Sequence, residues 1–296
     1  FGSKGWLDSI PLDTLKNVEV FFGDVKDLNC VKEAMKDCTH VFHLAALISI
    51  PYSYLAPASY IDTNIYGTLN VLEAAKELKI NQVIHTSTSE TYGTAQYVPI
   101  DENHPLVGQS PYSASKIGAD QLAISFWKSF STPVTIIRPF NTYGPRQSNR
   151  AIIPTIITQI ACGKKDIKLG KLTPTRDFNF VSDTCQAFIK VLNCKNALGK
   201  VINSSSNFEI SIGETVQLIA KIMNQDINII SEEKRFRPSS SEVNRLYGDN
   251  SLLKKLTGWS PVFGGLDGFS KGLSITANWF SNPKNLERYS SEKYLV

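Results

Sequence analysis

Two stretches decide the fold of this chain: residues 82–88, Gln-Val-Ile-His-Thr-Ser-Thr, and residues 111–116, Pro-Tyr-Ser-Ala-Ser-Lys. The first is short, apolar and rich in β-branched residues, which predicts a buried strand over Gln82–Thr86. The second opens a long helical pattern over Ser113–Phe130. A strand ending in hydroxyl residues and followed by such a helix indicates an α/β fold.

Strands and helices alternate on both sides of this pair. The further strands predicted are Val18–Phe22, Thr39–Leu44 and Val134–Ile137, and the further helices are Leu28–Met35 and Asp62–Glu77. Near-continuous apolar strands separated by helices indicate a parallel sheet with both faces covered. Because crossovers of this kind are right-handed, the sequence predicts a doubly wound α/β core.

The rhythm becomes less regular after Arg138, where a smaller C-terminal lobe is predicted. Its expected helices are Ala151–Cys162, Asp183–Leu192, Ser211–Met223 and Gly264–Phe280, and its expected strands are Ile167–Leu169 and Ile227–Ile230. We predict a cofactor-binding domain over residues 1–145. Residues 146–296 form mainly a substrate lobe, with some segments returning to the core. The lobe is expected at the carboxyl ends of the strands, where α/β sheets bind ligands.

Composition excludes several classes of protein. The chain has 296 residues and a formal net charge of +4 without basic runs, so no nucleic-acid partner is expected. No apolar run approaches the roughly 18 residues of a membrane helix, and no membrane partner is expected. The five cysteines are odd in number and lack C-x-x-C spacing, which indicates reduced thiols and a cytoplasmic protein. The four histidines form no metal pattern.

Tyr112 and Lys116 stand four residues apart, which places both on one face of the predicted helix. A free Tyr, with a pKa of about 10, is a poor base at neutral pH. A nearby ammonium would lower that pKa, and the pair could then accept a hydroxyl proton. A surface Tyr and a solvated Lys are the alternative, which the preceding strand with Thr86 and Thr88 disfavours.

Together with these residues, motifs across nearly the whole chain resemble the extended short-chain dehydrogenase/reductases, the NAD-dependent epimerase/dehydratase family. The similar strings are Gly23-Asp24-Val25, His43-Leu44-Ala45-Ala46, residues 63–68 (Thr-Asn-Ile-Tyr-Gly-Thr), residues 139–146 (Pro-Phe-Asn-Thr-Tyr-Gly-Pro-Arg), Arg176-Asp177-Phe178 and Gly258-Trp259-Ser260-Pro261. The resemblance implies a Rossmann-type sheet and the family's proton-transfer residues at Thr88, Tyr112 and Lys116.

The resemblance also implies a bound nicotinamide cofactor, NAD, with NADP left open. The cofactor-binding positions that carry over are Asp24, Val25, Leu44, Ala45, Ala46, Asn64, Thr86, Tyr112, Lys116 and Pro139. A homodimer is the expected assembly.

Glu90, in residues 88–93 (Thr-Ser-Glu-Thr-Tyr-Gly), points to the 4,6-dehydratase branch of the family. In the family that this chain resembles, epimerases and decarboxylases usually carry a small residue at the position of Glu90. Once C4 of a sugar is oxidised, a carboxylate can remove the acidic C5 proton and help to expel the C6 hydroxyl. The dTDP-glucose type has an Asp where this chain has Ser89, so either Glu90 serves both steps or a water relayed by Ser89 helps. A solvated turn residue is the alternative reading of Glu90.

Further likeness points to dehydratases acting on GDP- or UDP-N-acetylglucosamine in legionaminic-acid-type pathways. It lies in residues 47–54 (Leu-Ile-Ser-Ile-Pro-Tyr-Ser-Tyr), 87–90 and 137–148. The substrate positions implied are Ser89, Asn141, Arg176 and Arg237, where guanidinium groups suit a diphosphate. Surface ion pairs are the alternative for the two arginines, and an Asx-type turn is the alternative for Asn141.

Two other functions stay open. A C4 epimerase would share Thr88, Tyr112 and Lys116 but would not need Glu90. A non-catalytic NAD(P)-binding protein on the same fold would need neither Tyr112 nor Lys116, and both are present.

The resemblance places a strand and a Gly-rich turn ahead of Phe1, the first residue of this sequence. That turn supplies backbone N–H groups for the cofactor's pyrophosphate, and a residue near it chooses between NAD and NADP. The chain as given is therefore expected to bind NAD weakly, to associate through exposed strand edges and to turn over little.

Overall fold

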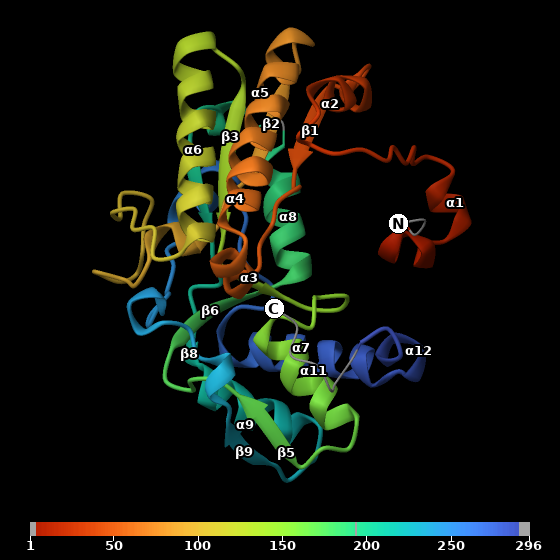
Figure 1. Cartoon of the computed structure of the whole chain (residues 1–296), viewed down its shortest axis with the longest axis vertical. Helices are drawn as coiled ribbons and strands as arrows, with labels where there is room; N and C mark the ends of the chain where they lie inside the picture. The colour runs from red at the N-terminus through yellow and green to blue at the C-terminus, as the bar shows by residue number, and fades with distance from the viewer. Residues whose placement is uncertain (1–3, 193, 290–296) are drawn as a thin grey trace.

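The computed structural model describes residues 4–192 and 194–289, which form an upper and a lower lobe (Figure 1). Four parallel strands cross the upper lobe in the order β1 (His40–His43), β2 (Gln82–Thr86), β3 (Val134–Pro139) and β7 (Val201–Ser204). In register, His43 lies beside His85 and Thr86 beside Ile137. The carboxyl ends of β1, β2 and β3 therefore meet at one edge, above the lower lobe, and the predicted parallel α/β sheet is confirmed.

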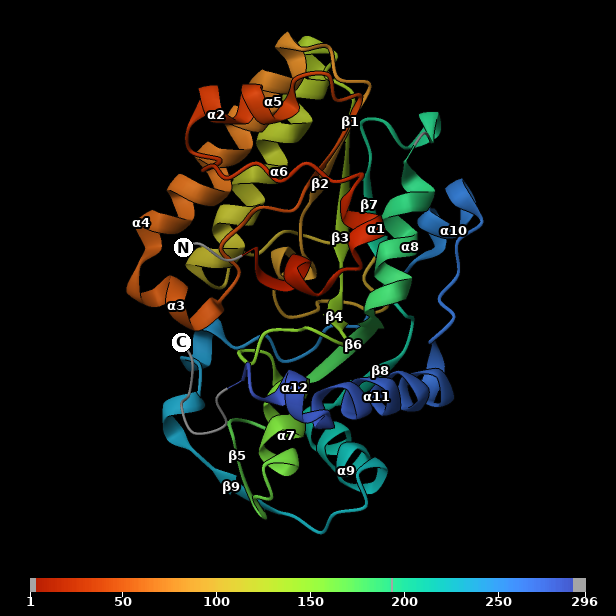
Figure 2. The ribbon, with the colours of Figure 1, turned by 90° about the vertical axis from the view of Figure 1, so that its right-hand side faces the viewer.

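Helices cover both faces of this sheet, as Figure 2 shows. On one face lie α2 (Leu28–Met35), α5 (Gly67–Glu77) and α6 (Pro111–Phe130), and on the other lie α8 (Val181–Val191) and α10 (Ser251–Thr257). Successive residues of β2 serve the two faces: Val83 packs with α5 and α6, whereas Ile84 packs with α8. Both are fully buried. This alternation explains why the strand is apolar throughout and confirms the doubly wound core.

Most predicted elements are present, with bounds within a few residues. The predicted helix 62–77 begins as a π-helical segment, η2 (Ile61–Tyr66), and continues as α5. Two short helices before it, α3 (Ile50–Leu55) and α4 (Pro57–Tyr60), carry no clear periodicity and were not predicted. They fold over the start of α6, where Tyr60 and Tyr112 meet edge to face with ring centroids 6.2 Å apart.

The predicted strand Val18–Phe22 is wrong. This segment has no regular secondary structure and pairs with no strand among the described residues, and Val18, Phe21 and Phe22 are all exposed. A β-branched and aromatic run shows propensity alone, whereas a strand exists only where a neighbour takes up its backbone hydrogen bonds.

The lower lobe packs around an aromatic and aliphatic core. Its helices are α7 (Ile152–Ala161), α9 (Ile212–Ile222) and α11 (Gly265–Ser281), and Phe178, stacked on Phe269 with centroids 5.5 Å apart, lies among them. A capping box between Ser211 and Glu214 starts α9. Two small sheets complete the lobe: β4 (Asn141–Tyr143), β6 (Thr175–Phe180) and β8 (Glu209–Ser211) in one, and β5 (Asp166–Leu169) and β9 (Asn228–Ser231) in the other.

The chain crosses between the lobes more than once. Elements α8, β7 and α10 all follow residue 145, yet they pack on the upper sheet. The division into 1–145 and 146–296 stays a prediction, and its outer limits lie outside the described residues.

The remaining helical elements of the described chain are short. They are η1 (Gly5–Ser9), α1 (Leu12–Leu15), η3 (Ser89–Tyr92), η4 (Lys195–Ala197), η5 (Glu233–Arg235), η6 (Ser239–Ser241) and α12 (Pro283–Leu286). The segment with η1 and α1 reaches out from the upper lobe (Figure 1), and Trp6 packs on Trp279 of α11 with ring centroids 5.2 Å apart. Over the described part of the chain, no helix is long and apolar enough to cross a membrane.

Gly199, in the turn before β7, yields a test of this packing. It has φ +73°, and a Cβ built on it would overlap the Trp127 indole ring. Gly163 has nearly the same φ, +75°, but a Cβ there meets nothing within 4 Å. Both alanine variants should lose about 1–2 kcal/mol for the left-handed backbone. Gly199→Ala should lose about 1–3 kcal/mol more because of overpacking. Urea unfolding measures both, and equal losses would contradict the packing described.

Candidate active site

The candidate site lies where β2 and β3 end and α6 begins. Thr88 follows β2 and caps η3, with its Oγ1 accepting a hydrogen bond from the Glu90 N–H at 3.2 Å. The Ser110 capping box starts α6, which carries Tyr112 and Lys116 in its first two turns. Thr88, Glu90, Tyr112 and Lys116 are each at most 9% exposed. The fold thus brings the four predicted catalytic residues into one buried region.

Tyr112 is not activated as the sequence predicted. Burial raises its pKa well above the usual value, the charge of Glu90 raises it further, and the hydrogen bond with Thr88 only partly opposes this. The prediction of a lowered pKa is therefore wrong for the structure, because Tyr112 lies in an apolar cluster with Ile50 and Tyr60.

Lys116 lies one turn along the same face of α6. Its Nζ donates a hydrogen bond of 2.6 Å to the carbonyl oxygen of Thr86, the last residue of β2. Burial lowers the pKa of Lys116 to about 8, and the charge of Asp120 works against that fall. At neutral pH Lys116 is therefore still mostly an ammonium, held at the end of the strand.

Glu90 is buried, so the solvated-turn alternative for it is wrong. Its carboxylate is close enough to act electrostatically on both Tyr112 and Arg176. A buried carboxylate between a phenol and a guanidinium is placed for proton transfer or for charge balance.

Two arginines from the lower lobe meet at a carboxylate that the sequence analysis missed. Arg176 Nη2 lies 3.6 Å and Arg237 Nη1 lies 3.7 Å from Glu242 Oε1. Arg176 is buried, which lowers its pKa, whereas the Arg237 side chain is 26% exposed. Both arginines therefore form ion pairs, as the alternative interpretation expected. The pair of Arg176, however, is buried and does not lie at the surface. No local pattern marks Glu242, because only the path of the loop after Arg237 brings its carboxylate between the two cations.

The remaining substrate positions differ in how fully they are engaged. Ser89 is buried beside Glu90 in η3. Asn141, at the start of β4, has a buried Oδ1 with no hydrogen-bond partner, so no Asx-type turn is formed through this atom. An unpaired buried acceptor is a position that a hydroxyl of a bound sugar can satisfy.

The predicted cofactor positions fit the edge where strands end. Leu44, Ala45 and Ala46 follow β1 and are exposed or half-buried, and Pro139 ends β3. Thr86 has a buried Oγ1 with no hydrogen-bond partner. A ligand at this edge would meet this unpaired oxygen and the loop after β1, as α/β sheets commonly arrange.

Three other predicted cofactor residues have partners within the protein. Asn64 in η2 bonds the backbone N–H and C=O of Leu47 at 2.8 and 2.9 Å and the Ser115 Oγ at 2.9 Å, so it ties the loop after β1 to α6. Asp24 is exposed and pairs with Lys26 at 3.3 Å. The neighbouring Val25 carbonyl accepts a hydrogen bond from Asn70 of α5.

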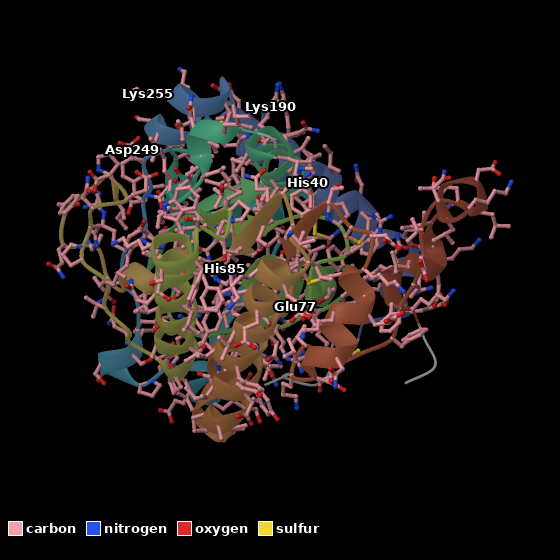
Figure 3. The ribbon with its side chains drawn as sticks, turned by 90° about the horizontal axis from the view of Figure 1, so that it is seen from above. His40, Glu77, His85, Lys190, Asp249 and Lys255 are labelled. Atoms are coloured by element: carbon pink, nitrogen blue, oxygen red, sulfur yellow. The ribbon has the colours of Figure 1, made fainter. Side chains whose placement is uncertain are left out.

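A buried charge cluster that the sequence analysis did not identify lies behind Lys116. The cluster contains Asp120 of α6, Arg138 of β3, His85 of β2 and Ser87, which directly follows β2. Figure 3 shows His85 in the middle of the upper lobe, between α5 and α6 on one side and α8 on the other. One sequence pattern could have indicated this cluster: Asp120 stands four residues after Lys116 and so lies on the same face of the helix. Among the described residues, no group of three or more His, Cys, Asp or Glu side chains could hold a metal ion.

Comparison with known proteins shows relatives along most of the chain. The human dTDP-D-glucose 4,6-dehydratase is 28% identical over 288 residues, which cover 92% of this chain and 79% of the human protein. The solved dTDP-glucose 4,6-dehydratase of Bacillus anthracis, in complex with NAD, superposes with a TM-score of 0.78 at 26% identity, covering 92% of this chain and 84% of that one.

An epimerase resembles this chain about as closely as these dehydratases do. The UDP-N-acetylglucosamine 4-epimerase of Methanobrevibacter ruminantium, solved with UDP-N-acetylmuramic acid, has a TM-score of 0.77 at 29% identity, covering 87% of this chain and 81% of that one. Residues 3–270 match the family model described as GDP-mannose 4,6 dehydratase. The predicted family is confirmed: the chain belongs to the NAD-dependent epimerase/dehydratase family of extended short-chain dehydrogenase/reductases, in its nucleotide-sugar 4,6-dehydratase group.

Proposed function

We propose that this protein is a nucleotide-sugar 4,6-dehydratase that loses water across C5–C6 of a GDP- or UDP-N-acetylhexosamine. The observation that supports this most is Glu90, a buried carboxylate whose charge reaches Tyr112. A C4 epimerase has no step that needs a second base at this place, whereas elimination does.

The proposed roles follow the chemistry of each side chain. Tyr112, which burial keeps protonated in the structure as described, would have to be in its phenolate form to take the proton of the C4 hydroxyl as C4 becomes a ketone, and its hydrogen bond with Thr88 favours that form. Glu90 then removes the C5 proton, which the ketone has made acidic, and helps the C6 hydroxyl to leave as water. Because this chain has Ser89 in place of a second acid, Glu90 itself or a water held by Ser89 supplies the proton to the leaving hydroxyl.

NAD is the proposed cofactor. When bound, it would accept the hydride from C4 and later return it to C6. Leu44, Ala45, Ala46, Thr86 and Pro139 would hold it at the strand ends. Lys116, with its ammonium anchored on the Thr86 carbonyl, would present its other hydrogens to the ribose. The complex of the Bacillus anthracis relative with NAD supports this choice.

The proposed substrate is an N-acetylhexosamine joined to GDP or UDP. Arg176 and Arg237 would bind the diphosphate, with Glu242 balancing their charge in its absence. The unpaired Asn141 Oδ1 would accept a hydrogen bond from the sugar. The N-acetylglucosamine epimerase among the similar structures supports the amino sugar, and it also makes C4 epimerisation the second candidate.

A homodimer in the cytoplasm is the proposed setting. The apolar side chains of Leu55 in α3 and of Ile61 and Tyr66 in η2 are between 50% and 71% exposed, and contact with a second copy would cover them. The five cysteines are all free, in line with a reducing compartment.

Product mass separates the candidate reactions. Incubated with UDP- and GDP-N-acetylglucosamine in turn, a dehydratase gives a product lighter by one water. An unchanged mass with inverted C4 would instead identify an epimerase, and tight NAD binding without turnover of either sugar would indicate a binding protein.

Glu90→Gln should abolish elimination, because an amide cannot take the C5 proton, while oxidation at C4 remains. The expected loss in the rate of water release is about 10²–10⁴-fold. Reduced cofactor, seen by absorbance, should accumulate without dehydrated product. Glu102→Gln is the matched control, since Glu102 Oε1 accepts a hydrogen bond from the Asn203 N–H that Gln can still accept. Dehydration by Glu90→Gln at the parent rate would remove Glu90 from the mechanism.

Tyr112→Phe should lose the first proton transfer and with it about 10²–10⁴-fold in kcat. Tyr60→Phe is the control: this neighbouring hydroxyl donates to the Ser49 carbonyl, so its loss should affect stability and spare turnover. Stopped-flow measurement of cofactor reduction tests the step directly. Normal reduction by the Tyr112→Phe variant would place the proton acceptor elsewhere.

Arg237→Ala should weaken binding of GDP or UDP more than it slows the chemistry, because the diphosphate is not the reacting centre. We expect a loss on the order of 2 kcal/mol, the lower end for a charge pair, since part of the side chain is exposed. Calorimetry with the nucleoside diphosphate measures it. Arg235→Ala, two residues earlier and paired with Glu232 at 2.6 Å, should leave this affinity unchanged, and equal effects of the two variants would count against the assignment.

A further inference from the structure

Asp120 has no role in the chemistry proposed above, yet it is fully buried beneath it. Its Oδ2 accepts hydrogen bonds from Ser87 Oγ at 2.8 Å, Arg138 Nη2 at 2.8 Å and Arg138 Nε at 3.1 Å. Its Oδ1 lies 3.3 Å from His85 Nε2. A buried carboxylate costs several kcal/mol unless positive charge and hydrogen bonds compensate it, so its partners must supply both.

The positive charge does not come from the buried histidines. Burial lowers the pKa of His85 and lowers that of His43 well below its usual value, so both are neutral near pH 7. Burial alone would raise the pKa of Asp120, but the contact with His85 and the charge of Arg138 hold it below its usual value. Asp120 is therefore ionised, and Arg138 is its closest charged partner.

Lys116 stands one helical turn before Asp120 on α6, so the two side chains share a face. The titratable groups that interact with Lys116 through their charges are His43 from β1, His85 from β2 and Asp120 from its own helix, and Arg138 from β3 is linked to it through Asp120. Tyr112 lies one turn earlier on the same face of α6. Of these, Asp120 carries the negative charge that favours a protonated Lys116.

We propose that Asp120 is a positioning residue whose carboxylate keeps Lys116 an ammonium inside the protein and fixes Arg138 beneath the turn that carries Glu90. The second half of this role follows from Tyr92, the last residue of η3. The Arg138 guanidinium lies over the Tyr92 ring, 4.9 Å from its centroid, and the Tyr92 hydroxyl donates to Asn203 Oδ1 at 2.7 Å. One carboxylate thus supports both the helix with Tyr112 and Lys116 and the turn with Thr88 and Glu90.

The importance of a charged Lys116 rests on the proposed function, but its titration can be measured in the protein alone. NMR of protein with ¹³C-labelled lysine follows the Lys116 side chain, and Lys116→Met identifies its signal. Asp120→Asn keeps the shape and removes the charge, so the titration midpoint of Lys116 should fall by about one pH unit or more.

Two variants control for general damage to the core. Asp177→Asn alters another fully buried aspartate, bonded to Ser206 and Gly248 in the lower lobe, and should leave the Lys116 midpoint in place. Ser87→Ala removes one hydrogen bond from Asp120 and keeps its charge, so it should also leave the midpoint in place. If Asp120→Asn does not fold, Asp120→Asn with Arg138→Met removes both charges, and the midpoint should fall in the same direction by a smaller amount.

The proposal is overturned if the Lys116 midpoint stays at its parent value in the folded variant that lacks Asp120, or if Asp177→Asn lowers it equally. Failure of the proposed function looks different. Full dehydratase turnover by Lys116→Met would remove Lys116 from the chemistry, and the effect of Asp120 on its titration would stand.

Discussion

The ion pair between Asp120 and Arg138 is the interaction on which the arrangement of the site depends. It joins α6 to β3 where both are fully enclosed, and the Ser87 hydroxyl extends it to the end of β2. Breaking one side of such a pair leaves an uncompensated charge in the interior, which costs far more than losing a surface pair. The helix that carries Tyr112 and Lys116 therefore has little freedom to shift against the strands whose ends form the floor of the site.

Burial sets the electrostatics of the proposed catalytic groups. It raises the pKa of Tyr112 and lowers that of Lys116 to about 8, which disfavours both charged forms. A buried phenol becomes a useful base only when positive charge or hydrogen bonds favour its phenolate, and Thr88 supplies one such bond. In the structure as described, Lys116 is engaged with the strand end, so the site is built and buried while its tyrosine remains protonated.

The lower lobe contributes two arginines, of which Arg176 interacts with the charge of Glu90. Arg176 comes from β6 and Arg237 from the loop before η6, and Glu242 lies between them. Elements of the second half also return to the sheet, where α8 and α10 pack on the face opposite α6. The second half of the chain therefore contributes elements to both lobes, and both lobes contribute residues to the candidate site.

The sequence by itself determined the parallel α/β core through its periodicity, and it identified the family and the grouping of Thr88, Glu90, Tyr112 and Lys116 through the resemblance of its motifs. Periodicity of 2 or 3.6 marks buried strands and helices, and Tyr112 and Lys116 share a face by spacing alone. It missed β6, β7, β8 and α10, whose place depends on distant partners, and it assigned a strand to Val18–Phe22, which finds no partner among the described residues. Only the tertiary structure decided the direction of the Tyr112 pKa, the Glu242 bridge between Arg176 and Arg237, and the cluster around Asp120. Each of these depends on burial and on contacts between residues tens of positions apart. No local sequence pattern shows which side chains lose water on folding or which distant charges come together.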